Sequence, residues 1–462
     1  MMNQLKSIFL IPELSKKIYF TLIILAVYRI GYFIPLPVVD HVEMAKTMSN
    51  QTGAFSQLLN FVSQFSGGNL SQACIFALGI MPYISASIIM QLLAAVVPSL
   101  ERLQKEGEAG RKTINRRTRQ LTVAICLVQS VFWVRHLMAP ASSGGLGLAV
   151  AGYASGSAYF FYFISTVLVM TAGTMFLMWL GEQVDEYGIG NGISLIIMAG
   201  IVCRIPDATV ALLFDVTETG YVLKSSLYTL GGTGGSDISF EKLMVLGILF
   251  IAVVMAVVAI TKAQRRIPLQ SARHVKGRRV YGGTRANLPL KVNQAGVMPV
   301  IFASSLLILP NLFFSILNSS GSSSFLRGLQ SSLNERSWTY NVLYIGLIYF
   351  FCYFWTAIQF NPKDLANNLK EHGSFIPGYR PGKRTADYLE KVLMRITYVG
   401  AAFLAIIAII PNIVNRAMDV DYRVASFYGG TGLLIVISVA LDLVQKINSH
   451  LVMRNYTGLT DE

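Results

Sequence analysis

Long apolar segments alternate with short polar ones along almost the whole chain. A helix needs roughly 20 apolar residues to cross a hydrocarbon layer of about 30 Å. Ten runs approach or exceed this length, at roughly residues 18–37, 73–97, 120–138, 158–180, 190–213, 242–262, 293–317, 339–360, 388–411 and 428–449. The pattern predicts an all-α polytopic membrane protein with ten transmembrane helices in two halves of five.

The composition agrees with a bilayer environment. Hydrophobic residues make up 53% of the 462 positions and charged residues only 13%, whereas soluble domains average about 25% charged residues. The first run contains Arg29 and ends in Ile34-Pro-Leu-Pro37 without a small-residue cleavage site, so we expect a retained helix and not a removable signal peptide. The four cysteines stand singly, in no spacing suited to a metal or a redox pair, which predicts a packing role and no cofactor.

The net charge of +14 is unevenly distributed. Lysine and arginine concentrate in 98–120, 262–291 and 360–395, whereas the connection 139–157 has none. By the positive-inside rule, the basic loops and both termini are predicted to be cytoplasmic. We therefore expect the following organisation: an N-terminal half at 1–213, an external linker at 214–241, a C-terminal half at 242–450 and a cytoplasmic tail at 451–462, with large cytoplasmic loops at 262–291 and 361–387.

One motif occurs twice. Gly79-Ile-Met-Pro-Tyr-Ile-Ser-Ala-Ser87 and Gly296-Val-Met-Pro-Val-Ile-Phe-Ala-Ser304 share six of nine residues. The first copy runs toward a basic loop and the second starts from one, so the halves are predicted to be inverted repeats around a central pathway.

Each copy of the motif carries a proline inside an apolar run. We expect Pro82 and Pro299 to disturb their helices and to free carbonyl groups, which nearby hydroxyls would satisfy. The candidate hydroxyls are those of Ser85, Ser87, Ser304 and Ser305. The alternative is that glycine, proline and serine are ordinary packing residues of transmembrane helices.

The segment from Asn60 to Ser71 is apolar at intervals, too short to cross a bilayer and interrupted by Gly67 and Gly68. It is typical of a half-helix that enters the protein and breaks there. An external amphipathic helix on the bilayer surface is the alternative.

The sequence resembles the SecY family, the pore-forming subunits of the general protein-secretion channel. Specific stretches span nearly the whole chain: Arg29-Ile-Gly31, Phe33-Ile-Pro-Leu-Pro37, Phe65-Ser-Gly-Gly68, Phe76 to Ser87, Lys105-Glu-Gly-Glu108, Gly173 to Glu182, Gly188-Ile-Gly-Asn-Gly-Ile193, Gln264-Arg-Arg266, Gly277-Arg-Arg-Val-Tyr281, Leu288 to Asn293, Asn361-Pro362 and Tyr428 to Ile435. The resemblance implies a passive, gated channel that secretes unfolded preproteins and releases hydrophobic segments sideways into lipid.

The resemblance also implies partners and a location. The partners are the small membrane subunits SecE and SecG, the motor ATPase SecA, a translating ribosome with its nascent chain, signal peptides and membrane lipids, with association with YidC and SecDF as a further expectation. The implied location is the bacterial inner membrane with both termini cytoplasmic, and a plastid thylakoid membrane is the alternative.

Site residues follow from the family motifs. The pore ring falls on Ile80, Ile84, Ile193, Ile197, Ile301 and Ile435, and the plug, at about 57–71, includes Phe61, Phe65, Ser66, Gly67 and Gly68. The lateral gate involves Pro82, Ser85, Ser87, Pro299 and Ser304, and motor or ribosome docking falls on Arg265, Arg266, Arg278, Arg279 and Arg380. For these arginines, the alternative is that they only fix topology and attract anionic lipid.

Two other function classes fit the sequence poorly. A secondary transporter shares the inverted repeat but ordinarily carries ionisable side chains near mid-membrane, whereas Glu182, Asp185 and Glu186 fall at the predicted cytoplasmic end of a span. An enzyme is not expected, because Gly107 to Thr113 lacks the adjacent Gly-Lys-Ser/Thr of a phosphate loop and no His-Glu-x-x-His zinc motif occurs.

Overall fold

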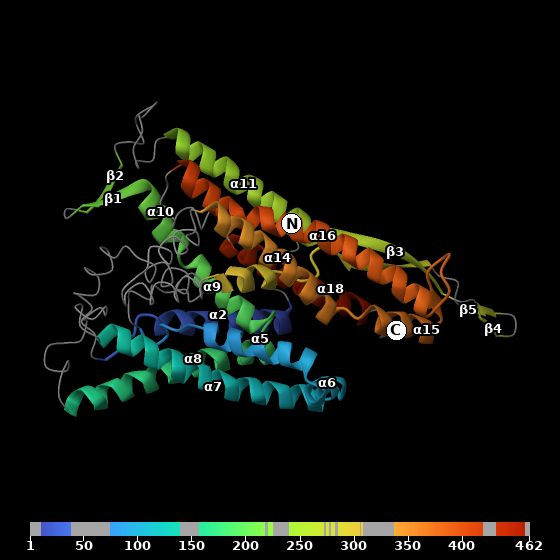
Figure 1. The fold of residues 1–462 in the computed structure, drawn as a ribbon, viewed down its shortest axis with the longest axis horizontal. Coiled ribbons are helices and arrows are strands. Elements are labelled where there is room, and N and C mark those ends of the chain that lie inside the picture. Colours follow the sequence, from blue (N-terminus) through green and yellow to red (C-terminus); the bar gives the residue numbers. More distant parts are fainter. Residues whose placement is uncertain are drawn as a thin grey trace. The chain divides into compact units, whose positions relative to one another are not determined.

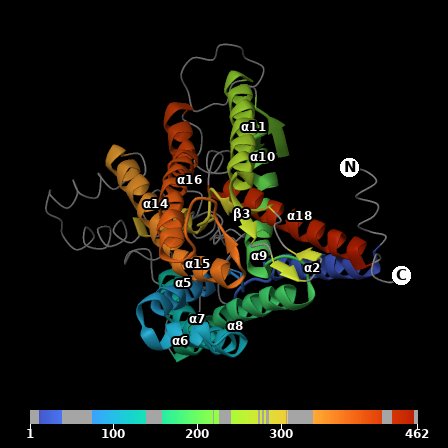
Figure 2. The same ribbon diagram turned by 90° about the vertical axis from the view of Figure 1, so that its right-hand side faces the viewer.

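The computed structural model describes residues 11–37, 74–138, 157–217, 220–224, 240–271, 274–276, 279–281, 285–304, 306–307, 337–418 and 431–457. The chain forms two compact units, one of Met1–Pro206 with Val439–Glu462 and the other of Asp207–Ser438. Figure 1 and Figure 2 show the ribbon of the chain, coloured from the N-terminus to the C-terminus. The predicted plug residues and Ser305 lie outside the described residues.

The described elements of the first unit are helices, and an isolated β-bridge joins Pro35 to Cys74. Its elements are α2 (Pro12–Gly31), α5 (Met81–Val96), α6 (Pro98–Lys105), α7 (Glu108–Met138), α8 (Ser157–Tyr187) and α9 (Gly192–Val202), with the later part of α18 (Thr431–Thr457). Helix α7 packs along α5 and α8, and α2 packs against α8. A buried cluster of Met90, Ala94 and Leu100 fixes the corner between α5 and α6, where the chain turns by 103°.

The second unit combines helices with small sheets. Its helices are α10 (Ile205–Leu213), which begins at the unit boundary, α11 (Phe240–Lys262), a segment at 298–304, α14 (Trp338–Gln359), α15 (Pro362–Glu371), α16 (Lys383–Met418) and the start of α18. Helices α14 and α16 lie side by side in both ribbon views. They share one apolar core, to which α14 contributes Ile348 and Cys352 and α16 contributes Leu404 and Ala408.

The connecting loops contain strands that the all-α prediction did not foresee. Strands β3 (Gln264–Ser271), β6 (Arg285–Lys291) and β7 (Ser374–Phe375) form an antiparallel sheet in the order β6-β3-β7. Two further hairpins join β1 (Phe214–Thr217) to β2 (Gly220–Leu223) and β4 (His274–Lys276) to β5 (Arg279–Tyr281).

Where the structure describes them, the predicted spans correspond to helices with some differences in length, and residues 308–317 of the run 293–317 lie outside the described residues. Among the described residues, α8, α11, α14, α16 and α18 are long and apolar enough to cross a membrane, and the bent pair of α5 and α6 would be a sixth. The predicted runs 18–37 and 120–138 are also largely helical, in α2 and α7. The run 190–213 is divided into α9 and α10, because Pro206 starts a new helix after the turn at Cys203 and Arg204.

Candidate functional site

The two copies of the repeated motif have the same local structure. Gly79 and Gly296 both take positive φ angles, 57° and 65°, which glycine adopts without strain. A helix begins two residues later in each copy, at Met81 and at residue 298. The N–H of Ile84 donates to the carbonyl of Ile80 at 3.1 Å, and at the equivalent position the N–H of Ile301 donates to the carbonyl of Val297 at 3.4 Å.

This geometry corrects the expected role of the prolines. Pro82 and Pro299 lie in the first turn of their helices, where the backbone N–H has no helical acceptor, so they start the helices and do not kink them. The prolines therefore free no carbonyl in mid-helix. Ser304 instead donates to the carbonyls of Val300 and Ile301, at 2.9 and 3.0 Å.

The predicted gate residues lie near these helix starts. Pro82, Pro299 and Ser304 are buried, whereas Ser85 and Ser87 are partly buried on α5. Ser87 accepts a hydrogen bond from Gln91, one turn later on the same helix, at 3.4 Å.

The predicted ring residues are mostly buried. Their exposed fractions are 1% for Ile80, 6% for Ile84, 7% for Ile197, 6% for Ile301 and 4% for Ile435, and Ile193 is partly buried. The first unit holds Ile80, Ile84, Ile193 and Ile197, and the second unit holds Ile301 and Ile435. The ring itself stays a prediction, because its six members belong to two separate units.

A tight turn between α8 and α9 fixes the start of the helix that carries Ile193 and Ile197. The side chain of Asp185 accepts the N–H of Gly192 at 2.7 Å, and Asn191 caps α9 by accepting the N–H of Ser194 at 3.0 Å. A Cβ atom on Gly192 would lie 2.0 Å from the carbonyl oxygen of Gly181 in α8. Gly192 therefore serves the close packing of α9 against α8.

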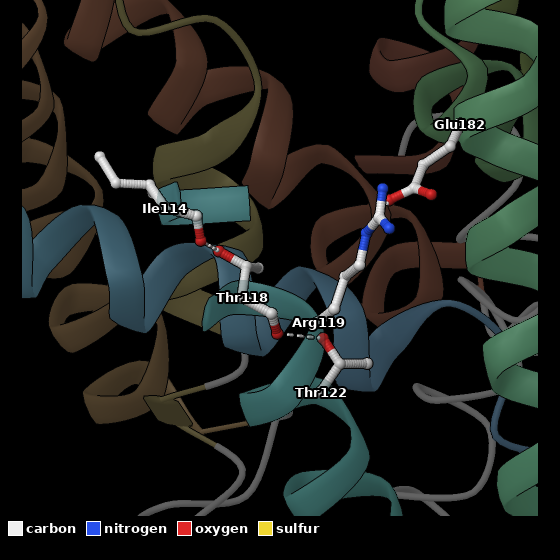
Figure 3. A network of polar contacts seen from close by, with 5 residues as sticks. All are labelled: Ile114, Thr118, Arg119, Thr122 and Glu182. Atoms are coloured by element: carbon white, nitrogen blue, oxygen red, sulfur yellow. Dashed lines mark hydrogen bonds and ion pairs between the residues drawn. The ribbon is translucent and has the colours of Figure 1, made fainter. Parts of the chain in front are cut away.

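Two of the three carboxylates predicted at the cytoplasmic end of a span, Glu182 and Asp185, have structural partners. Glu182 of α8 pairs with Arg119 of α7 at 2.7 Å, and Figure 3 shows the guanidinium directed at the carboxylate. Beside Arg119, Thr118 and Thr122 donate to carbonyls one turn earlier on α7. With Asp185 bonded to Gly192, these acids hold helix ends together, which is not the role of an ion carrier in a transporter.

The two large loops that were predicted to be cytoplasmic form one platform, defined here as the sheet β6-β3-β7. Gln270 and Ser271 of β3 pair with Phe375 and Ser374 of β7, so a strand from loop 262–291 joins one from loop 361–387. Below the sheet lies a buried cluster of Ile267, Leu269, Leu290, Ile376, Leu389, Val392 and Ile396. The sheet is therefore packed onto the start of α16, so the platform has an apolar core of its own.

Strand alternation separates two of the docking arginines. Arg265 pairs with Leu290 and Arg266 with Pro289, and consecutive strand residues point to opposite faces. Arg265 thus lies on the same side of the strand as Ile267, whereas Arg266 lies on the outer face with polar residues and prolines. Both arginine side chains are exposed. Lys291 lies opposite Gln264 on that outer face and is exposed. The sequence analysis did not name it as a candidate docking residue, because only the strand register reveals which face of the sheet it occupies.

The other docking arginines lie farther along the loops. Arg380 is exposed after β7, and Arg279 begins β5. Arg278 lies outside the described residues. Among the residues that the structure does describe, no group of three or more His, Cys, Asp and Glu could hold a metal ion.

Comparison with known proteins identifies the family of this chain. A family model described as SecY matches residues 74–444. The chain belongs to the SecY family. It is 40% identical to protein translocase subunit SecY of Chlamydia trachomatis serovar D, over 99% of this chain and 98% of the relative. It is 42% identical to the same subunit of Escherichia coli strain K12, over 96% of this chain and 93% of the relative.

Solved structures of the SecY and Sec61 channels share the fold. A protein-conducting channel matches with a TM-score of 0.58 at 20% identity, over 95% of this chain and 93% of the other. Sec61 in the canine ribosome-channel complex from the endoplasmic reticulum matches with a TM-score of 0.56 at 18% identity, over 95% and 93%. The sequence-based family and the helical, polytopic fold are confirmed, and the chain is a multi-pass integral membrane protein and not an enzyme.

Proposed function

We propose that this chain is the channel subunit of a protein translocase, a passive, gated conduit for unfolded preproteins. The observation that carries the proposal is its identity of 40–42% to curated translocase subunits over at least 93% of their length. Glu182 pairs with Arg119 of α7, and Asp185 accepts the N–H of Gly192 at the start of α9. Because these two carboxylates are engaged in structural contacts, the channel is favoured over an ion-coupled transporter.

The proposed constriction is the isoleucine ring. Branched apolar side chains narrow a pore, offer no ligand to an ion and favour dewetting, yet they deform around a passing peptide. Support comes from the burial of five of the six side chains and from the equivalent backbone hydrogen bonds at Ile84 and Ile301. The plug at about 57–71 is proposed from the family resemblance alone.

The proposed lateral gate lies between the helices that start at the two motif copies. A hydrophobic segment would leave through it because a leucine gains a few tenths of a kcal/mol in lipid, whereas a central charge costs about 2.5 to 3.5 kcal/mol. The same pore would thus secrete polar chains and integrate apolar ones.

Energy and docking would come from partners on the cytoplasmic platform. SecA or a translating ribosome would use the exposed arginines there, and SecE and SecG would complete the membrane complex. The basic loops favour cytoplasmic termini, and the bacterial inner membrane is proposed from the family resemblance. Relatives at the canine endoplasmic reticulum and in yeast were solved in complexes with ribosomes.

The test is reconstitution of the chain with SecE, SecG and SecA in proteoliposomes. We expect ATP-dependent protection of a signal-bearing preprotein from external protease. Absence of protection, together with ion-coupled uptake of a small solute, would refute the channel in favour of the transporter.

A further inference from the structure

The loop that presents Arg380 is held on both sides of this residue. On one side, the ring of Tyr379 lies against the ring of Tyr388 with centroids 4.3 Å apart, and the Tyr379 N–H donates to the carbonyl of Ile376 at 3.1 Å. On the other side, the hydroxyl of Thr385 donates to the carbonyl of Arg380 at 2.9 Å. The backbone around Arg380 is therefore fixed, while its side chain is exposed.

Both anchors are part of the packed platform. Thr385 is 2% exposed, so water competes poorly for its hydroxyl. Tyr388 packs against the buried cluster that contains Ile376 and Leu389. The two anchoring residues lie in the first turns of α16 (Lys383–Met418), so a long helix holds the loop from below.

The chain within the loop is itself restricted. Gly378 and Gly382 have positive φ angles of 87° and 107°, although nothing lies within 4 Å of either missing Cβ. Glycine is therefore favoured at both positions by the positive φ angle and not by a lack of space. Pro381, between them, has its φ angle fixed by its ring. The N–H groups of Thr385 and Ala386 both donate to the carbonyl of Gly382 at 3.0 Å, which closes the loop onto the helix.

We propose that Thr385 and Tyr388 are positioning residues that preorganise Arg380 for docking of the motor ATPase. Preorganisation helps binding because a residue that is already ordered loses less conformational entropy in the complex. This inference rests on the proposed function, in which Arg380 contacts a partner that drives translocation.

Charge favours a protein surface over RNA as the partner of this loop. Loop 361–387 mixes lysine and arginine with Asp364, Glu371 and Asp387, whereas loop 262–291 is basic without any aspartate or glutamate. A mixed surface repels a polyphosphate in places but matches a protein partner that carries both signs. We therefore assign the Arg380 loop to the motor.

The test compares Thr385→Val with Thr385→Ser in the reconstituted translocase. Valine keeps the size of threonine but removes the hydroxyl, and serine retains the hydroxyl. We expect Thr385→Val to raise the motor concentration for half-maximal translocation about five- to twentyfold, the effect of freeing one residue, with the maximal rate within about twofold of wild type. Thr385→Ser should behave as wild type.

A second pair of variants, at Tyr388, and a double variant of Thr385 and Arg380 distinguish positioning of Arg380 from a general structural effect. Tyr388→Leu should raise the half-maximal motor concentration and Tyr388→Phe should not, which keeps the proposal testable if Thr385→Val fails to accumulate. In an Arg380→Ala background, Thr385→Val should have no further effect, because the hydroxyl acts through Arg380.

Three results would overturn the proposal. The first is an unchanged half-maximal motor concentration in both Thr385→Val and Tyr388→Leu. The second is that Thr385→Val raises this concentration by the same factor in the Arg380→Ala background as in the wild-type background. The third is that Thr385→Val weakens ribosome binding by the same factor as motor binding. If wild-type proteoliposomes themselves show no motor-dependent protection, the proposed function fails, and this outcome is visible before any variant is compared.

Discussion

Gly192 offers a sharp test of how the chain positions two of the predicted ring residues. In Gly192→Ala, the new Cβ would lie 2.0 Å from the carbonyl oxygen of Gly181, and real Cβ atoms essentially never come within 3.0 Å of another atom. Helices α8 and α9 would have to separate by about 1 Å at this point, since a backbone carbonyl cannot rotate away as a side chain does. The movement would also strain the 2.7 Å bond to Asp185.

The magnitude follows from these two contacts. Overpacking costs about 1–3 kcal/mol, and a hydrogen bond to a charged group contributes about 1.5–3 kcal/mol. We expect Gly192→Ala to lower the free energy of unfolding by about 3 kcal/mol, or more than a hundredfold in the unfolding equilibrium. Because α9 carries Ile193 and Ile197, a shifted helix should also raise the resting ion leak.

Gly181→Ala is the matched control for the same helix contact. Its Cβ would lie 3.2 Å from the Cγ1 atom of Ile193, so this side-chain atom, unlike a backbone carbonyl, has to shift by only a few tenths of an ångström. The gain of about 1 kcal/mol from replacing a helical glycine by alanine offsets this strain, so we expect near-neutral stability. Thermal unfolding of the purified translocase in detergent measures both variants. A stable Gly192→Ala, or a Gly181→Ala that is the less stable of the two, would refute the reasoning.

Three further predictions concern the gate, the platform and the rejected transporter. Replacement of Ile84 and Ile301 by glycine should raise resting ion conductance in planar bilayers, since it removes two apolar side chains from the proposed seal, and unchanged conductance would exclude them from the constriction. Arg266→Ala should reduce the slope of log ribosome affinity against log salt by about one. Arg265→Ala should reduce it less, because Arg265 is exposed but lies on the side of the strand that packs onto the buried cluster, and equal slopes would contradict the assigned faces. Glu182→Gln should lower stability by at most about 1 kcal/mol, because its partner Arg119 has a side chain that is 52% exposed. The variant should preserve ATP-dependent translocation, whereas complete loss of transport would revive an ion-carrying role.

The repeated motif illustrates how far sequence patterns reach. The matching residues at Gly79 and Gly296 predicted a duplication, and both glycines take positive φ. The expected proline kink was wrong because the length of an apolar run does not reveal where its helix begins. Pro82 was placed in mid-helix from the start of the run at 73, but the chain forms turns up to Ile80 and the helix starts at Met81.

The sequence by itself determined the membrane class, most of the helices and the family, because these depend on local composition and on motif residues close together along the chain. The tertiary structure alone decided how separate loops combine, as in the pairing of Gln270 with Phe375, about a hundred residues apart. It also decided which face Arg265 and Arg266 occupy and which residues hold Arg380. Such contacts depend on register and long-range packing, and no local pattern in a polar loop specifies either.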